Sequence, residues 1–98
     1  MRIFSRSTLL EFWTRHRDAE EPLRLWFSQV EKLNWTGPAD VRTTFGTADF
    51  VANNRIIFNI KGNKYRLIAH VRYAPFCLLY IRFVGTHAEY DRVDAVTI

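Results

Sequence analysis

Groups that exchange protons follow the last apolar run of the chain within one short stretch. Directly after Gly85 the sequence contains Thr86, His87, Glu89, Tyr90 and Asp91. Histidine titrates near neutral pH and can act as a general acid or base, and a tyrosine or a carboxylate can be its counterpart or can orient it. We therefore predict a proton-transfer site in which His87, Tyr90 and Glu89 are the candidate catalytic residues. The alternative is a polar loop in which His87 only ends a turn.

Cationic side chains alternate along the apolar segments that precede this stretch. In the segment 65–73, Arg66, His70 and Arg72 fall on the face opposite Tyr65, Leu67, Ala69, Val71 and Tyr73. In the segment 77–84, the alternation puts Tyr80, Arg82 and Val84 on one face, and Leu79, Ile81 and Phe83 on the other. We expect one open sheet face with phosphate-binding and base-stacking groups, namely Arg66, Arg72, Tyr80 and Arg82, with Lys61 and Lys64 at its rim. The alternative is an ordinary solvated sheet face.

The charge is concentrated in the same half of the chain. The protein has 98 residues and a formal net charge of +4, and residues 1–54 contain as many acidic as basic side chains. Residues 55–98 contain seven Lys or Arg against three Asp or Glu. An excess of this kind favours a polyanionic partner, with nucleic acid ahead of a membrane surface.

Several kinds of chemistry find no support in the sequence. Cys77 is the only cysteine, which excludes an internal disulfide and favours a reducing cytoplasm. Neither an HExxH motif nor paired Cys and His residues occur, and no glycine-rich phosphate loop is present. We therefore expect no metal and no cofactor. His16 is expected on the surface, and no apolar run is long enough to span a membrane.

The predicted elements place the candidate residues on strands of one domain that spans residues 1–98. Ser5 or Ser7 can cap a first predicted helix that runs to about Arg15, and further helices are predicted over 19–33 and 38–45. In the second helix Leu23, Trp26, Phe27 and Val30 recur at helical steps. Strands are predicted over 2–4, 55–60, 65–73 and 77–84, with a tight turn at 61–64 whose positive φ angles Gly62 and Asn63 supply. The order predicts a two-layer α+β domain in which the N-terminal helices pack on one face of an antiparallel sheet.

Two segments resemble the HigB family of bacterial type II toxins, within the RelE-like superfamily. They are "NIKGNKYRLIAHVRY", residues 59–73, and "YIRFVGTHAEYD", residues 80–91. The resemblance implies a small ribonuclease that cuts mRNA in the A site of the 70S ribosome and is held inactive by a HigA-type helix-turn-helix antitoxin. It also implies that Arg66 contacts the scissile phosphate and that His87 and Tyr90 handle protons. RelE members use closely spaced lysines ahead of the arginine strand, whereas here Lys61 and Lys64 flank the turn.

The implied chemistry agrees with the residue types. Metal-free RNA cleavage requires removal of a proton from the attacking 2′-hydroxyl, a proton for the leaving 5′-oxygen and stabilisation of charge on the phosphoryl oxygens. Arg66 and Arg82 suit the last task. Two alternatives stay open: a ParE-like toxin that binds DNA gyrase without cutting RNA, and an RNA-binding module without catalytic activity.

Overall fold

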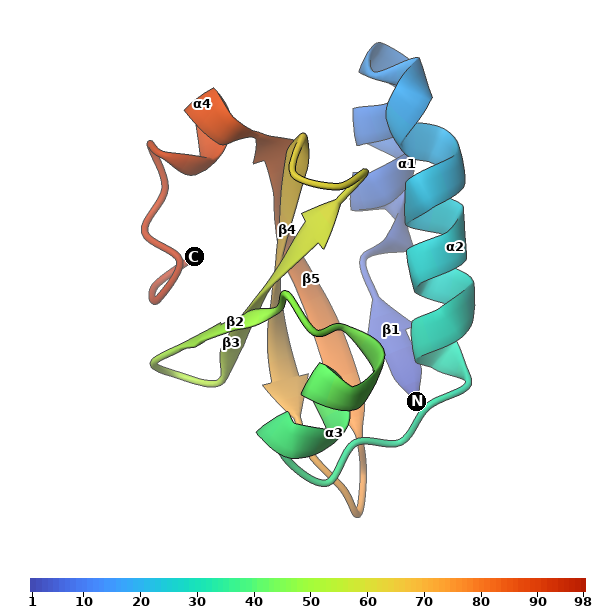
Figure 1. Ribbon diagram of the computed structural model, residues 1–98, viewed down its shortest axis with the longest axis vertical. Coiled ribbons are helices and arrows are strands. Elements are labelled where there is room, and N and C mark those ends of the chain that lie inside the picture. Colours follow the sequence, from blue (N-terminus) through green and yellow to red (C-terminus); the bar gives the residue numbers. More distant parts are fainter.

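The structure, a computed structural model that describes residues 1–98, combines a five-stranded sheet with several helices (Figure 1). The helices are α1 (Arg6–Arg15), the 3₁₀ turn η1 (Arg17–Ala19), α2 (Glu20–Glu31), α3 (Pro38–Thr44) and α4 (His87–Tyr90). The strands are β1 (Arg2–Phe4), β2 (Asp49–Val51), β3 (Arg55–Ile60), β4 (Tyr65–Arg72) and β5 (Leu78–Thr86). This arrangement confirms the predicted α+β fold class. No helix is long and apolar enough to cross a membrane.

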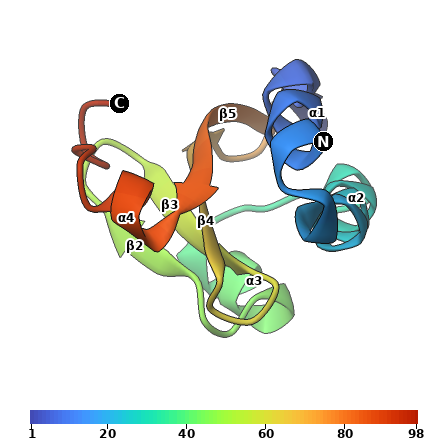
Figure 2. The same cartoon turned by 90° about the horizontal axis from the view of Figure 1, so that it is seen from above.

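Helix α2 forms where the sequence predicts it because its apolar residues are spaced so that they lie on one face of the helix. Leu23, Trp26 and Val30 are buried, and Glu20 and Glu21 lie in the first turn, where the helix dipole favours negative charge. Both ribbon views show α1 and α2 side by side along one face of the sheet, with α4 and the end of the chain on the other side (Figures 1 and 2). We call the side away from α1 and α2 the outer face.

The sheet has the strand order β1-β5-β4-β3-β2 and is mixed rather than wholly antiparallel. The strand pairs from β5 through β2 are antiparallel, but β1 runs parallel to β5. In the sequence β1 is followed by α1 and α2, and a connection of this length allows a parallel pair. Strand β2 was not among the predicted strands. It is three residues long and pairs only at the sheet edge with β3, so its local sequence carries little strand signal.

The core lies between the sheet and α1, α2 and α3. Tyr65, Leu67, Ala69 and Val71 are buried there, as the alternation in β4 predicts. Ile57 and Ile68 are also buried, but they belong to the outer face and lie outside the main core cluster. The chain after α4 returns along this side of the sheet (Figure 1). There Asn53 Nδ2 donates to O of Val96 at 3.1 Å.

A bulge in β5 reverses the alternation that the sequence predicts. Ile68 pairs with Phe83, whereas Ala69 pairs with Ile81, so Arg82 has no partner on β4. Val84 consequently joins the core, and the side chain of Phe83 moves to the outer face opposite Ile68. The predicted faces were therefore wrong for Phe83 and Val84, because a single extra residue changes the side on which every later side chain lies.

The connection between β3 and β4 comprises the four residues of the predicted turn. Ile60 pairs with Tyr65, and the intervening residues 61–64 make a turn in which Lys64 N donates to O of Lys61 at 3.2 Å. The positive φ angles occur at Lys61 (54°) and Gly62 (62°), not at Gly62 and Asn63 as predicted. Asn63 is thereby free to bond with β4 and α4, which places this turn beside the end of β5.

Candidate functional site

Three of the predicted catalytic residues meet at the β3–β4 turn. Arg66 Nη1 donates a hydrogen bond to Oδ1 of Asn63 at 2.6 Å. His87 Nε2 donates to the backbone oxygen of the same asparagine. The guanidinium carbon of Arg66 lies 5.8 Å from the centre of the Tyr90 ring. Because Arg66, His87 and Tyr90 are all partly exposed, an arginine, an imidazole and a phenol share one accessible surface.

A capping box at the end of β5 positions His87 and Tyr90. Thr86 begins α4, its Oγ1 accepts from Glu89 N at 3.2 Å, and the Glu89 carboxylate accepts from Thr86 N at 2.8 Å. The two reciprocal bonds fix the first turn of a helix that has only four residues. His87 and Tyr90 are three positions apart, so they project from the same side of this turn toward β4.

Glu89 occupies the cap rather than the space beside Arg66. The backbone hydrogen bond from Thr86 holds the pKa of Glu89 below its usual range, against the opposing effect of partial burial. A carboxylate that stays ionised and already accepts a hydrogen bond is suited to orienting α4. The prediction that Glu89 is itself catalytic remains a prediction.

Gly85 makes room for an aromatic ring next to Arg66. Gly85 is the partner of Arg66 across the β4–β5 pair, so a side chain at position 85 would share the outer face with the arginine. The Phe83 ring occupies that space: a Cβ at position 85 would lie 3.1 Å from its Cε1 and closer still to its Cζ. The glycine that precedes α4 therefore has a packing role in the site.

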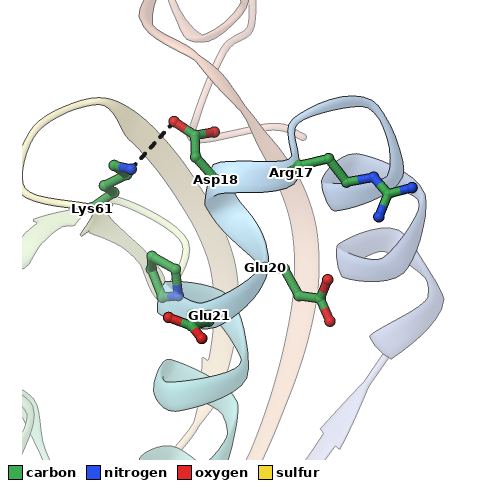
Figure 3. A pocket seen from close by; sticks show the side chains of 6 residues that line it. Arg17, Asp18, Glu20, Glu21 and Lys61 are labelled. Atoms are coloured by element: carbon green, nitrogen blue, oxygen red, sulfur yellow. Dashed lines mark ion pairs between the residues drawn. The ribbon is translucent and has the colours of Figure 1, made fainter.

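The two lysines predicted to bind phosphate are held by Asp18 from η1. Lys61 Nζ lies 3.4 Å from Oδ2 of Asp18, Lys64 donates to the same oxygen, and Tyr65 Oη donates to Oδ1 at 2.5 Å. Figure 3 shows Asp18 directed toward Lys61, while Arg17 points away from it. The bonds from Lys64 and Tyr65 hold the pKa of Asp18 far below its usual range, and the carboxylate in turn raises the pKa of Lys64. An incoming phosphate would compete with Asp18 for both lysines.

The remaining predicted RNA-binding residues lie at the other end of the outer face. Arg72, Tyr80 and Arg82 line an open depression of about 410 Å³ together with Asn54 and His70. The structure thus divides the predicted residues into three places: Arg66, His87 and Tyr90 at the β3–β4 turn, Lys61 and Lys64 at Asp18, and Arg72, Tyr80 and Arg82 in this depression.

Sequence reasoning missed the residues that connect these groups. Asn63 was read only as a turn residue, although it bonds with Arg66 and His87 through different oxygens. Asp18 was not singled out, because its partners Lys61, Lys64 and Tyr65 lie more than 40 positions away in the chain. His16, which was expected on the surface, is partly exposed, and its ring stacks on Phe12 with centres 4.4 Å apart. No group of three or more His, Cys, Asp or Glu side chains is arranged to hold a metal ion.

A comparison with protein families identifies the family. The family described as "HigB_toxin, RelE-like toxic component of a toxin-antitoxin system" matches residues 19–93, which include α2, all strands from β2 to β5, and α4. No curated protein matched the chain. The matched range contains the Asn63, Arg66, His87 and Tyr90 arrangement, and a toxin of this kind has an antitoxin as its partner. The chain therefore belongs to the HigB toxin family, the RelE-like toxic components of toxin–antitoxin systems.

Proposed function

We propose that this toxin is an endoribonuclease that cuts mRNA in the ribosomal A site without a metal ion and so inhibits translation in the cytoplasm. The observation that supports the proposal most directly is the meeting of Arg66, His87 and Tyr90 around Asn63. This surface combines a permanent positive charge with two groups that can carry protons. Its natural inhibitor would be a HigA-type helix-turn-helix antitoxin.

The proposed reaction uses the RNA itself as the nucleophile. The 2′-oxygen forms a bond to the adjacent phosphorus while the bond from phosphorus to the 5′-oxygen of the next nucleotide breaks. One protein group takes the 2′-proton and another gives a proton to the departing 5′-oxygen. The products are a 2′,3′-cyclic phosphate and a free 5′-hydroxyl. Each proton step needs a side chain within hydrogen-bond reach of the reacting oxygen.

Arg66 is the group we assign to the phosphoryl oxygens. Its guanidinium presents two parallel donors to a phosphate, and it is already oriented by Asn63. Arg66→Lys would keep the charge but lose this geometry, so we expect a loss of about 100-fold or more in cleavage rate.

His87 and Tyr90 are the groups we assign to the two proton transfers. A carbonyl oxygen only accepts hydrogen bonds, so the contact with Asn63 requires the hydrogen on Nε2 of His87 and leaves Nδ1 to exchange a proton with the substrate. The arrangement leaves open which of the two residues is the base and which is the acid. We assign Glu89 to positioning, because its carboxylate already caps α4.

The test compares single-turnover cleavage of ribosome-bound mRNA by the wild type and the variants Arg66→Lys, His87→Ala and Tyr90→Phe. Arg17→Lys is the matched control, because Arg17 is exposed in η1 and makes no ion pair. We expect full activity in the control and losses of about 100-fold or more when a proton-transfer group is removed. Wild-type rates in His87→Ala and Tyr90→Phe would overturn the assignment of these residues.

A further inference from the structure

A row of side chains crosses four strands on the outer face, away from the β3–β4 turn. Phe4 on β1 pairs with Tyr80 on β5, Tyr80 pairs with His70 on β4, and His70 pairs with Arg55 on β3. The rings of Phe4 and Tyr80 are stacked with centres 5.0 Å apart and an interplanar angle of 13°. The rings of Tyr80 and His70 follow at 6.0 Å and 28°. The rings of Phe4, Tyr80 and His70 therefore form a continuous stacked row.

Positive charge without an acidic partner surrounds this row. Arg72 and Arg82 are exposed and line the depression beside His70 and Tyr80, which no acidic side chain lines. The ion pairs of the protein involve Arg24, Lys61 and Lys64, so neither arginine is neutralised. The bulge in β5 turns Arg82 so that its guanidinium carbon lies 5.5 Å from the centre of the Tyr80 ring.

His70, one of the residues that line the depression, also has an unsatisfied polar atom. Its Nδ1 is buried and has no hydrogen-bond partner, an arrangement that ordinarily destabilises a folded protein. Burial, followed by the charges of Arg55 and Arg82, lowers the pKa of this histidine, which keeps the ring neutral near pH 7. A neutral ring can stack on a nucleobase without adding to the repulsion between the neighbouring arginines.

Stacked rings with unpaired arginines are the chemistry that binds single-stranded nucleic acid. Bases stack on aromatic side chains, and arginines contact the phosphates between them. The depression is also in the size range of small-ligand sites. His70 and Arg66 lie four residues apart on the same face of β4, which separates their backbones by about 13 Å. The Arg66 guanidinium also extends toward Asn63, away from His70, so we assign a base held at His70 to a different nucleotide from the one whose phosphate is at Arg66.

We propose that Tyr80, His70, Arg72 and Arg82 form a second nucleotide site, which stacks one base of the substrate RNA a few nucleotides from the cut and holds the phosphate beside it. The proposal rests on the proposed ribonuclease function in taking RNA as the ligand. It adds a contact that acts on affinity and on the choice of sequence, at a distance from the reacting groups.

The test is binding of a fluorescent single-stranded RNA whose 2′-hydroxyls are methylated, so that the attack described above is blocked. Loss of one stacked base costs about 1–3 kcal/mol, so Tyr80→Ala should weaken binding by about 5- to 150-fold. Tyr80→Phe keeps the ring and should bind like the wild type. Arg82→Gln, at an exposed position where folding is not at risk, should lower the salt dependence of binding by about one counterion.

Unchanged binding in Tyr80→Ala together with an unchanged salt dependence in Arg82→Gln would overturn the second site. Cleavage of ribosome-bound mRNA is measured with the same preparations and separates this failure from that of the proposed function. A wild type that binds RNA through Tyr80 without cutting mRNA would contradict the ribonuclease and leave the nucleotide site standing. If the wild type cuts mRNA and Tyr80→Ala has the same KM and the same affinity for RNA, the nucleotide site alone is contradicted.

Discussion

Replacing Gly85 with alanine tests the packing that brings β5 and α4 to Arg66. The added Cβ would lie 3.1 Å from both Cε1 of Phe83 and Oε1 of Glu89, and closer still to Cζ of Phe83. Carbon atoms prefer separations of about 3.5–4.0 Å, so the tip of the ring must retreat by about 1 Å from the space it shares with Ile68. Overpacking of this kind costs about 1–3 kcal/mol. For a chain of this length, each kcal/mol lowers Tm by about 4–8 °C.

Thermal unfolding followed by circular dichroism measures this effect. Gly46→Ala is the matched control, because a Cβ at position 46 meets nothing within 4 Å and the residue does not have a left-handed φ, so we expect no loss of stability there. Phe83→Leu removes the atoms that clash, so adding Gly85→Ala in that background should cost less than it does in the wild type. Two results would refute the placement of the Phe83 ring over Gly85. One is a Gly85→Ala variant with the same Tm as the wild type, and the other is an equal drop in Tm from Gly85→Ala in the wild type and in Phe83→Leu.

Three further predictions follow from individual side chains. Glu89→Gln keeps the capping box, so its cleavage rate should stay within about tenfold of the wild type, whereas a loss of about 100-fold or more would make the Glu89 carboxylate a catalytic group. The pKa of Asp18 is lowered in the folded state, so its ionised form stabilises the fold above its ordinary pKa of about 3.9 and loses this effect as the pH falls below that value. In urea unfolding, the free energies of unfolding of the wild type and Asp18→Asn should therefore differ more at pH 7 than near pH 3. An equal difference at both pH values would contradict the contacts with Lys64 and Tyr65. NMR titration should give His70 a pKa below 6.5 that rises in Arg82→Gln, and an ordinary or raised value in the wild type would contradict its burial beside Arg55 and Arg82.

Much of the fold follows from local sequence because its periodic signals are strong. The stripe Leu23, Trp26 and Val30 predicts α2, and the alternation from Tyr65 to Val71 predicts the buried side of β4. The bulge at Arg82 was not predictable, because nothing in "YIRFV" marks an extra residue, yet it decides the sides of Phe83 and Val84. The parallel pairing of β1 and the short strand β2 depend on tertiary contacts that local patterns do not encode.

The candidate site was predictable in its chemical groups but not in their connections. Arg66, His87 and Tyr90 were selected for their residue types and for the family resemblance, and the structure brings them together. The role of Asn63 depends on the left-handed conformation of Lys61 and Gly62, which sets the course of the turn. The binding of Lys61 and Lys64 by Asp18 joins η1 to the hairpin, a contact between segments that are distant in the sequence.

The measurement that tests the central claim most directly is primer extension on mRNA programmed into ribosomes, with the purified wild-type protein and a parallel sample of free mRNA. We predict new ends at A-site positions in the ribosomal sample alone, and their absence with Arg66→Lys. Intact mRNA in both samples would contradict the ribonuclease and favour a toxin that binds a protein target such as DNA gyrase. Cuts in both samples would contradict the requirement for the ribosome.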